Sequence, residues 1–175
     1  MRLLRSLDHL PDDLQRGALS IGNFDGVHRG HARLVERLLA KARDLGGPAI
    51  VFTFDPHPVR LLRPESAPPP LTWTDRKAQL LDELGVTAVI AYPTDEALLA
   101  LPPETFFQRI VQDALAARGM VEGPNFFFGH NRAGNIDTLA ALCQQAAISL
   151  EIVPPVQAAN EIVSSSRVRA AIQAG

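Results

Sequence analysis

The sequence predicts an α/β protein built on a parallel sheet of about five strands, with helices on both faces. Short apolar segments bounded by glycine or proline alternate with longer segments whose apolar residues recur at helical spacing. The first strand, helix and second strand form a β-α-β unit, which implies parallel pairing and a right-handed crossover. No repeat or obvious linker interrupts the alternation, so we expect one domain over residues 1–175.

The first β-α-β unit consists of a glycine-bounded apolar strand at residues 17–22, an amphipathic helix at 30–45 and a second apolar strand at 49–54. The same patterns predict strands at residues 86–92, 120–121 and 148–153, and helices at 74–84, 103–118, 136–147 and 163–172. Residues 55–73 contain six prolines and form a long irregular stretch, which in a compact domain is usually functional or disordered. We expect ligands at the carboxyl ends of the strands.

Composition and charge exclude several classes of protein. The chain has 46% apolar and 21% charged residues, as soluble globular proteins do, and its net charge of −2 argues against a nucleic-acid partner. The single Cys143 allows neither an internal disulfide nor a thiolate metal cluster. No apolar run is long enough to span a membrane, and residues 1–11 lack a signal-peptide core. We therefore expect a cytoplasmic protein without a membrane partner, and nothing in the sequence identifies a protein partner.

The basic residues are almost all arginines, because only Lys41 and Lys77 among the 17 are lysines. Arginine forks match phosphate oxygens. Genomic codon bias explains such an excess more simply, so we infer no site from it.

The most informative segment, residues 22–31 (GNFDGVHRGH), joins the first strand to the first helix. Its glycines lack the spacing of a dinucleotide fingerprint, and it has no P-loop lysine. It places His28 and His31 three residues apart at a helix N-terminus, where free amides and the helix dipole favour anions. Gly30 lets a phosphate approach the backbone without meeting a Cβ. A metal pair or ordinary loop histidines are alternatives, although no third metal ligand stands at a recognisable spacing.

Three further segments contain candidate binding residues. Residues 163–169 (VSSSRVR) begin the last helix; an N-cap explains any one serine, but the whole set suits a triphosphate. Arg167 and Arg169 point in different directions on a helix, so at most one faces a ligand directly. Residues 54–58 (FDPHP) form either a stiff site loop around His57 or a strand-terminating turn. Three consecutive aromatics in residues 123–129 (GPNFFFG) cannot all face one core, so at least one is free to stack on a flat ring.

Together and in this order, these segments resemble the FMN adenylyltransferase module of the bacterial bifunctional riboflavin kinase/FAD synthetase family, an H-x-G-H nucleotidylyltransferase. Residues 22–31 are similar to its G-N-F-D-G-V-H-x-G-H, 52–58 to its T-F-x-P-H-P, 123–129 to its G-x-N/D-F-x-F-G and 163–169 to its I-S-S-T/S-x-I-R. Leu71, Thr72, Lys77 and residues 84–86 resemble its L-T…K…L-G-V segment. The chain departs from the pattern at Phe127 and Asn135, and we expect the family's riboflavin kinase domain to be absent.

The resemblance implies a Rossmann-like nucleotidylyltransferase fold and an enzyme that makes FAD by transferring AMP from ATP to FMN, with release of pyrophosphate. It implies catalytic roles for His28 and His31, and Mg²⁺ held through the ATP phosphates with no metal site of the protein's own. The implied ATP-binding residues are Gly22, Asn23, Phe24, Asp25, Gly26, Gly30, Ser164, Ser165 and Arg169. The implied FMN-binding residues are Phe54, Pro56, His57, Pro58 and Asn125.

Two alternatives stay open at this point. One is an adenylyl- or cytidylyltransferase for another phosphorylated acceptor, which H-x-G-H alone allows but residues 54–58 and 163–169 argue against. The other is a non-catalytic flavin- or nucleotide-binding module, which the departures at Phe127 and Asn135 leave possible. A turnover assay with FMN and ATP separates all three.

Overall fold

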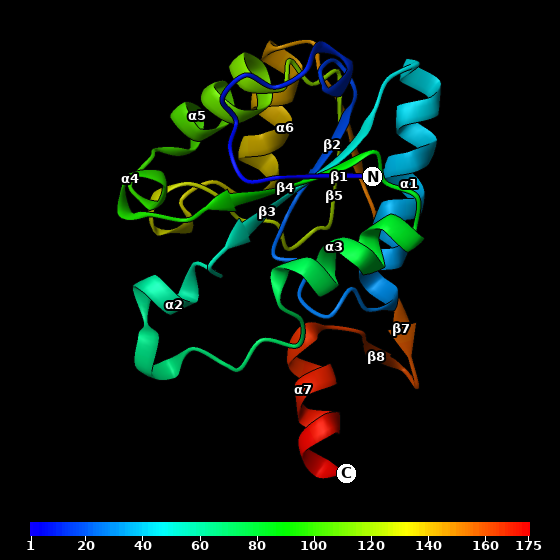
Figure 1. Cartoon of the computed structure of the whole chain (residues 1–175), viewed down its shortest axis with the longest axis vertical. Helices are drawn as coiled ribbons and strands as arrows, with labels where there is room; N and C mark the ends of the chain where they lie inside the picture. Colours follow the sequence, from blue (N-terminus) through cyan, green and yellow to red (C-terminus); the bar gives the residue numbers. More distant parts are fainter.

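The computed structural model describes all 175 residues and confirms the α/β class, with a parallel six-stranded sheet in the order β1-β4-β3-β2-β5-β6 (Figure 1). The strands are β1 (Arg2–Leu4), β2 (Ala18–Ile21), β3 (Ala49–Asp55), β4 (Ala88–Pro93), β5 (Gly119–Glu122) and β6 (Ser149–Ile152). A separate antiparallel hairpin consists of β7 (Gln157–Ala158) and β8 (Glu161–Ile162).

The α-helices are α1 (Arg29–Leu45), α2 (Val59–Leu62), α3 (Thr74–Glu83), α4 (Glu96–Leu99), α5 (Pro103–Phe106), α6 (Ile136–Gln145) and α7 (Ser165–Ala174). Three 3₁₀ turns, η1 (Asp12–Leu14), η2 (Pro64–Ser66) and η4 (His130–Arg132), and one π-helix, η3 (Phe107–Ala114), complete the structure. None of these helices has both the length and the apolar character needed to cross a bilayer.

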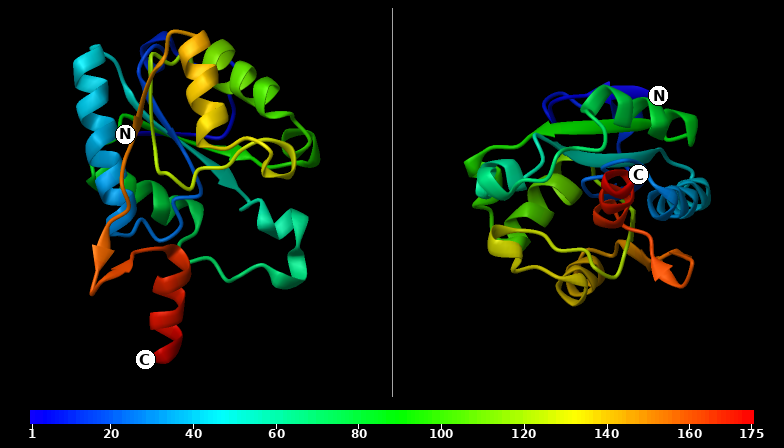
Figure 2. Two further views of the ribbon diagram at one scale, coloured as in Figure 1. Left: turned by 180° about the vertical axis from the view of Figure 1, so that it is seen from behind. Right: turned by 90° about the horizontal axis from the view of Figure 1, so that it is seen from below.

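The sheet separates two apolar cores, because successive strand residues point to opposite faces. Ile50 and Phe52 of β3 belong to the core covered by η3 and α6. Ala49 and Val51 of the same strand belong to the core covered by α1 and α3. Figure 2 shows helices on both sides of the sheet, as the sequence predicts.

The prediction of about five strands is wrong, because the sheet has six and a hairpin follows it. The missed strand, β1, has only three residues and lies at an edge beside β4, with no fully buried residue. Each strand of the hairpin has two residues. Elements this short contain no apolar run or alternation long enough to predict a strand.

The helix predicted at residues 103–118 ends earlier, at Ala114, and most of it is a π-helix. Ala116 has a left-handed backbone with φ of 46°, which stops the helix. The N–H of Arg118 then donates to the carbonyl of Gly17 at 2.9 Å and leads the chain into β5 beside β2. The apolar side of the segment is as predicted, since Phe106, Phe107 and Ile110 are buried.

The strand order places a topological switch point between β2 and β5. From β2 the chain crosses to β3 on one side, whereas β5 and β6 lie on the other. Pairing of β2 with β5 ends at Leu19, but pairing of β2 with β3 continues to Ile21, so β2 and β5 separate at their carboxyl ends. Open α/β sheets bind ligands at such a crevice.

Candidate active site

The two predicted histidines lie against each other where the β2–α1 loop enters helix α1. His28 is the N-cap of α1, and its Nδ1 accepts the backbone N–H of His31 at 3.4 Å. The two imidazoles stack, with centroids 3.7 Å apart and 15° between their planes. The buried ring of Phe24 lies 5.1 Å from that of His31. The H-x-x-H spacing therefore brings both rings together at the start of the helix.

Burial keeps both imidazoles neutral at pH 7. Burial lowers the pKa of His31 to about 3; proximity to His28, when that ring is protonated, and to Lys77 acts in the same direction. Burial also lowers the pKa of His28, although a hydrogen bond to its own backbone and the charge of Asp25 oppose this. Nδ1 of His31 and Oδ1 of Asn23 are buried without a hydrogen-bond partner. Buried polar atoms of this kind are rare and are available to a polar ligand group.

Three residues of this loop have a left-handed backbone: Phe24 (φ 48°), Gly26 (φ 80°) and Val27 (φ 38°). Such strain in residues other than glycine clusters at functional sites. A Cβ on Gly26 would also lie 2.8 Å from the side chain of Leu71. A Cβ on Gly30 would lie 3.1 Å from the ring of His28, so packing of that ring also favours glycine there.

Asp25 joins three distant parts of the chain. Its Oδ1 accepts the backbone N–H groups of Leu71 (2.9 Å) and Thr72 (3.0 Å), and its Oδ2 pairs with Arg169. The hydroxyl of Ser165 donates to the Asp25 carbonyl at 3.0 Å. The proline-rich loop before α3 and the start of α7 are thus fastened to the β2–α1 loop, and Figure 1 shows these segments side by side.

The serines and arginines at α7 have separate tasks. Ser164 is the N-cap of the helix and accepts the N–H of Arg167 at 3.3 Å. Arg169 also donates from Nε to the carbonyl of Pro69 at 2.8 Å. Arg167 turns away to the β7–β8 hairpin, where it pairs with Glu161 at 2.8 Å. The prediction that the two arginines point in different directions is confirmed.

The segment around His57 forms a turn at the carboxyl edge of the sheet, the edge where His28 and His31 also lie. It follows β3, and its backbone begins α2, with the N–H of Arg60 donating to the carbonyl of His57. Nδ1 of His57 accepts the N–H of Val59 at 3.1 Å, and burial lowers the pKa of the ring. Phe54 packs edge-on against Phe52, with centroids 5.5 Å apart.

The loop after β5 contains the remaining predicted residue, Asn125, which is exposed and makes no hydrogen bond through its side chain. Of the three aromatics that follow, Phe128 is buried, Phe126 stacks on it, and Phe127 is 45% exposed beneath the guanidinium of Arg132. One aromatic therefore lies outside the core, as predicted. Asn135, which departs from the family pattern, is the N-cap of α6.

Sequence reasoning assigned no role to three buried polar residues near these loops. Nζ of Lys77, on α3, donates to the hydroxyl of Thr53 at 3.1 Å, and that hydroxyl donates to the carbonyl of Asn23 at 3.1 Å. Glu122 accepts the N–H of Ile21 at 2.6 Å where β2 and β5 separate, and burial raises its pKa well above the usual range. Two signals for Lys77 were available: its match to the family's L-T…K…L-G-V segment, and its position beside Ala78 and Leu81 on one face of α3.

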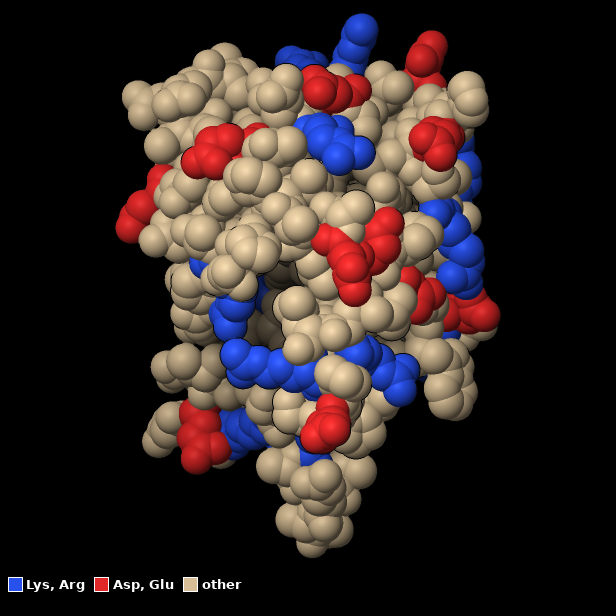
Figure 3. All heavy atoms as spheres, turned by 90° about the vertical axis from the view of Figure 1, so that its left-hand side faces the viewer, with Lys and Arg blue, Asp and Glu red and all other residues tan.

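The surface around this edge of the sheet is hollowed and basic. Figure 3 views the side that carries α2 and α4, where a hollow opens and Lys and Arg side chains border it at the height of α2. A border of this charge raises the local concentration of anions.

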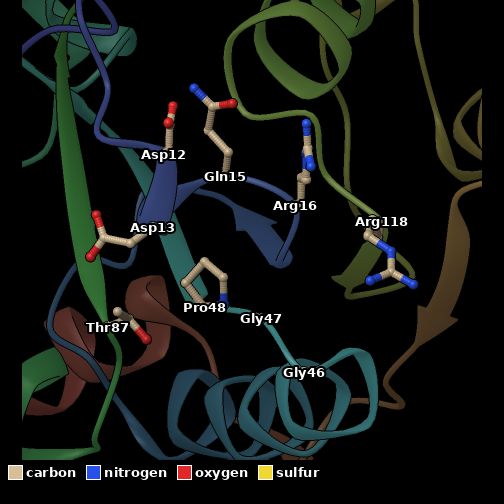
Figure 4. A pocket seen from close by; sticks show the side chains of 9 residues that line it. All are labelled: Asp12, Asp13, Gln15, Arg16, Gly46, Gly47, Pro48, Thr87 and Arg118. Carbon is tan, nitrogen blue, oxygen red and sulfur yellow. The ribbon is translucent and has the colours of Figure 1, made fainter.

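A second, wide hollow of about 510 Å³ lies at the opposite, amino edge of the sheet (Figure 4). It is lined by Asp12, Asp13, Gln15, Arg16, Gly46, Gly47, Pro48, Thr87 and Arg118. None of these residues belongs to the predicted site, and none is a histidine or has a buried unpartnered atom. We therefore place the candidate active site at the carboxyl edge.

A parallel α/β sheet whose first crossover helix begins with H-x-G-H at the carboxyl edge defines the nucleotidylyltransferase class of folds. The sequence profile of the family described as FAD synthetase matches residues 10–167. The chain belongs to this FAD synthetase family.

Two curated relatives are both described as bifunctional riboflavin kinase/FMN adenylyltransferase. The protein from Pseudomonas fluorescens is 34% identical over 174 residues, which cover 99% of this chain and 56% of the relative. The protein from Escherichia coli (strain K12) is 35% identical over 136 residues, which cover 77% of this chain and 44% of the relative. The chain thus spans about half the length of the curated relatives it matches.

Solved structures share the fold at low sequence identity. A Streptococcus pneumoniae protein described as a macrolide-efflux protein superposes with a TM-score of 0.81 at 23% identity, over 97% of this chain and 55% of that chain. Pantoate-beta-alanine ligase from Francisella tularensis superposes with a TM-score of 0.61 at 12% identity, over 97% of this chain and 73% of that chain. These likenesses concern the fold alone.

Proposed function

We propose that residues 1–175 act as one unit that transfers AMP from ATP to FMN and produces FAD and pyrophosphate. The observation that carries the proposal is the convergence of the His28–His31 pair, the 54–58 segment and the start of α7 at one edge of the sheet, in a member of the FAD synthetase family. The proposed enzyme is cytoplasmic, with FMN and ATP as its partners.

The proposed reaction needs no general base. A phosphate oxygen of FMN forms a bond to the α-phosphorus of ATP, while the bond from that phosphorus to the bridging oxygen breaks and its electron pair leaves with pyrophosphate. The second pKa of a phosphate monoester is near ~6, so the nucleophile is already largely ionised at pH 7. The protein's task is to align the two phosphates and to stabilise the charge that develops.

His28 and His31 act on the ATP phosphates in this proposal. Their neutral rings each offer an N–H donor, and bound phosphate charge raises the pKa of both rings, so that protonation can follow binding. The free N–H groups at the start of α1 add a site for an anion.

The other ATP-binding residues of the β2–α1 segment act through its backbone or its shape. The shape of this segment depends on Gly22, Asn23, Gly26 and Gly30. We assign Phe24 and Asp25 to ATP through their backbone only, because their side chains are buried or bonded within the protein.

Ser164, Ser165 and Arg169 hold the leaving pyrophosphate. Because these side chains bond within the protein in this structure, ATP binding must exchange some of those bonds. No group of three or more His, Cys, Asp or Glu side chains is placed to hold a metal ion. Mg²⁺ usually keeps several waters and binds through substrate phosphates, so we assign it to the ATP phosphates as part of the substrate.

The flavin side of the site is assigned to Phe54, Pro56, His57 and Pro58, with Asn125 at the junction of the two substrates. The stiff turn that begins α2 gives these residues a fixed position at the carboxyl end of β3. The flat ring of FMN would pack against this apolar surface.

The test is turnover of the purified protein with FMN, ATP and Mg²⁺. We expect FAD and pyrophosphate in equal amounts, and little product when CTP replaces ATP or another phosphorylated acceptor replaces FMN. Transfer of a nucleotide to another acceptor but not to FMN would instead support a different nucleotidylyltransferase. Binding of FMN or ATP without any product would support a non-catalytic module.

A further inference from the structure

Lys77 is a buried ammonium group with no carboxylate partner. The residue is 6% exposed, and its neighbours on α3, Ala78 and Leu81, are buried and apolar. No Asp or Glu oxygen lies within 4.0 Å of its Nζ, since all the ion pairs of the structure involve other cations. Burial lowers the pKa of Lys77, whereas the charges of Asp25 and Asp55, beyond ion-pair distance, raise it, so the buried charge is only partly compensated.

The ammonium group lies between the two halves of the candidate site. The Thr53 hydroxyl connects it to the carbonyl of Asn23, in the loop that precedes α1 and His31. Its charge lowers the pKa of both His31 and His57, so it is within electrostatic reach of the loop after β2 and of the turn after β3. Only one of the three N–H donors of the ammonium is used in this hydrogen bond.

The other basic side chains packed into the site are neutral or already paired, whereas Arg29 on α1 and Arg60 on α2 are exposed to solvent. His28 and His31 are neutral at pH 7, and Arg169 is paired with Asp25. Arg5, near the start of α3, is paired with Asp55 and Asp75. The proposed reaction brings an anionic phosphate against a triphosphate, and a fixed positive charge between them lowers that repulsion.

We propose that Lys77 is a substrate-binding residue whose ammonium group binds the phosphate oxygens of FMN at the point where they approach ATP. The inference rests on the proposed function and deepens it. We assign the group to the FMN phosphate because α3 enters the site beside the 54–58 segment, where the Thr74 hydroxyl donates to Asp55 at 2.7 Å. The ATP phosphates are assigned instead to the N-termini of α1 and α7.

The test compares FMN with riboflavin, which is the same flavin without the phosphate. Quenching of flavin fluorescence measures the binding of each without any turnover. The wild-type protein should prefer FMN, and Lys77→Met should weaken FMN binding by about tenfold to a hundredfold, the usual effect of losing a charged hydrogen bond. Binding of riboflavin should not change.

Lys41→Met is the matched control, because Lys41 is the only other lysine and lies on α1, 3.8 Å from Glu151. This control should keep wild-type binding and turnover. Lys77→Met should also keep or raise the melting temperature, because methionine removes a charge that burial disfavours. In turnover, Lys77→Met should raise the KM for FMN more than the KM for ATP. Lys77→Gln, which keeps a donor for Thr53 but has no charge, should also lose the preference for FMN.

Three results would overturn the inference. One is a preference for FMN that survives both substitutions at Lys77. Another is a lower melting temperature with equal weakening of FMN and riboflavin, which would make Lys77 a structural support of the Asn23 loop. The third is a rise in the KM for ATP alone. Failure of the wild-type protein to form FAD would refute the proposed function, and the binding comparison would still decide the role of Lys77.

Discussion

Helices α1 and α7 both begin at the candidate site, but the polar side chains at their N-termini differ in how far they are bonded within the protein. At α1, the loop backbone is left-handed at three residues, both imidazoles are neutral, and Nδ1 of His31 has no partner. At α7, the side chains of Ser164, Ser165 and Arg169 are all bonded within the protein. The N-terminus of α1 therefore keeps a buried ring nitrogen without a partner, whereas the polar side chains at α7 are satisfied within the protein.

This difference separates the effects expected from mutation. His28 caps α1, so its loss should reduce stability by about 1 kcal/mol, but loss of either imidazole should reduce the rate far more. The side chains at α7 must exchange bonds within the protein for bonds to the ligand. Their mutation should therefore change both the substrate affinity and the ordering of the proline-rich loop before α3. The predictions below test this contrast.

The largest effect is expected at α1. His28→Ala and His31→Ala should each reduce the rate of FAD formation by about 10²–10³-fold, the typical effect of removing one preorganised electrostatic group. Steady-state kinetics and thermal unfolding, measured on the same samples, provide the test. The melting temperature should change much less than the rate. Near-wild-type turnover in either variant would refute the catalytic assignment.

The next effect concerns acid stability. The folded protein holds the pKa of His31 at about 3, whereas the unfolded chain has its ordinary value of 6.5. Above pH 6.5 both states are neutral and stability is complete; as the pH falls from 6.5 toward 3, only the unfolded state gains a proton. The free energy of unfolding should therefore fall by about 1.4 kcal/mol per pH unit, or roughly 2 kcal/mol at pH 5.

Urea unfolding of the wild type and of His31→Asn between pH 7.5 and 5 measures this effect. The variant should show a flatter dependence, because asparagine does not titrate. Saturating ATP should also flatten the wild-type curve, since phosphate charge raises the pKa of the ring. Identical slopes for the two proteins would show that His31 is not held neutral by the fold.

The smallest effect is expected at α7. Arg169→Lys keeps the charge but loses the fork that reaches both Asp25 and the Pro69 carbonyl, so the KM for ATP should rise about tenfold and that for FMN much less. Arg167→Lys is the matched control, because Arg167 bonds only to the hairpin side. The reverse pattern would mean that Arg167, not Arg169, faces the nucleotide.

Local patterns in the sequence predicted the features that depend on neighbouring residues. The β-α-β unit, the placement of His28 and His31 together at a helix N-terminus and a serine cap on the last helix all follow from spacings of a few residues. The task of Asp25 could not be predicted in this way, since its partners stand 46 and 144 positions along the chain. Glu122 was missed for a related reason: its position depends on β5 lying beside β2, which is a property of strand order.

The bond between Asp25 and Arg169 also bears on the order in which the parts of the protein fold. A chain synthesised from its N-terminus has the sheet strands complete at Ile152, well before Arg169 exists. Helix α7 contributes no buried residue to either core and projects from the body of the protein (Figure 1). Because α7 adds nothing to either core, we expect proteolytic removal of α7 to leave the sheet folded and to remove the side chains proposed to hold pyrophosphate.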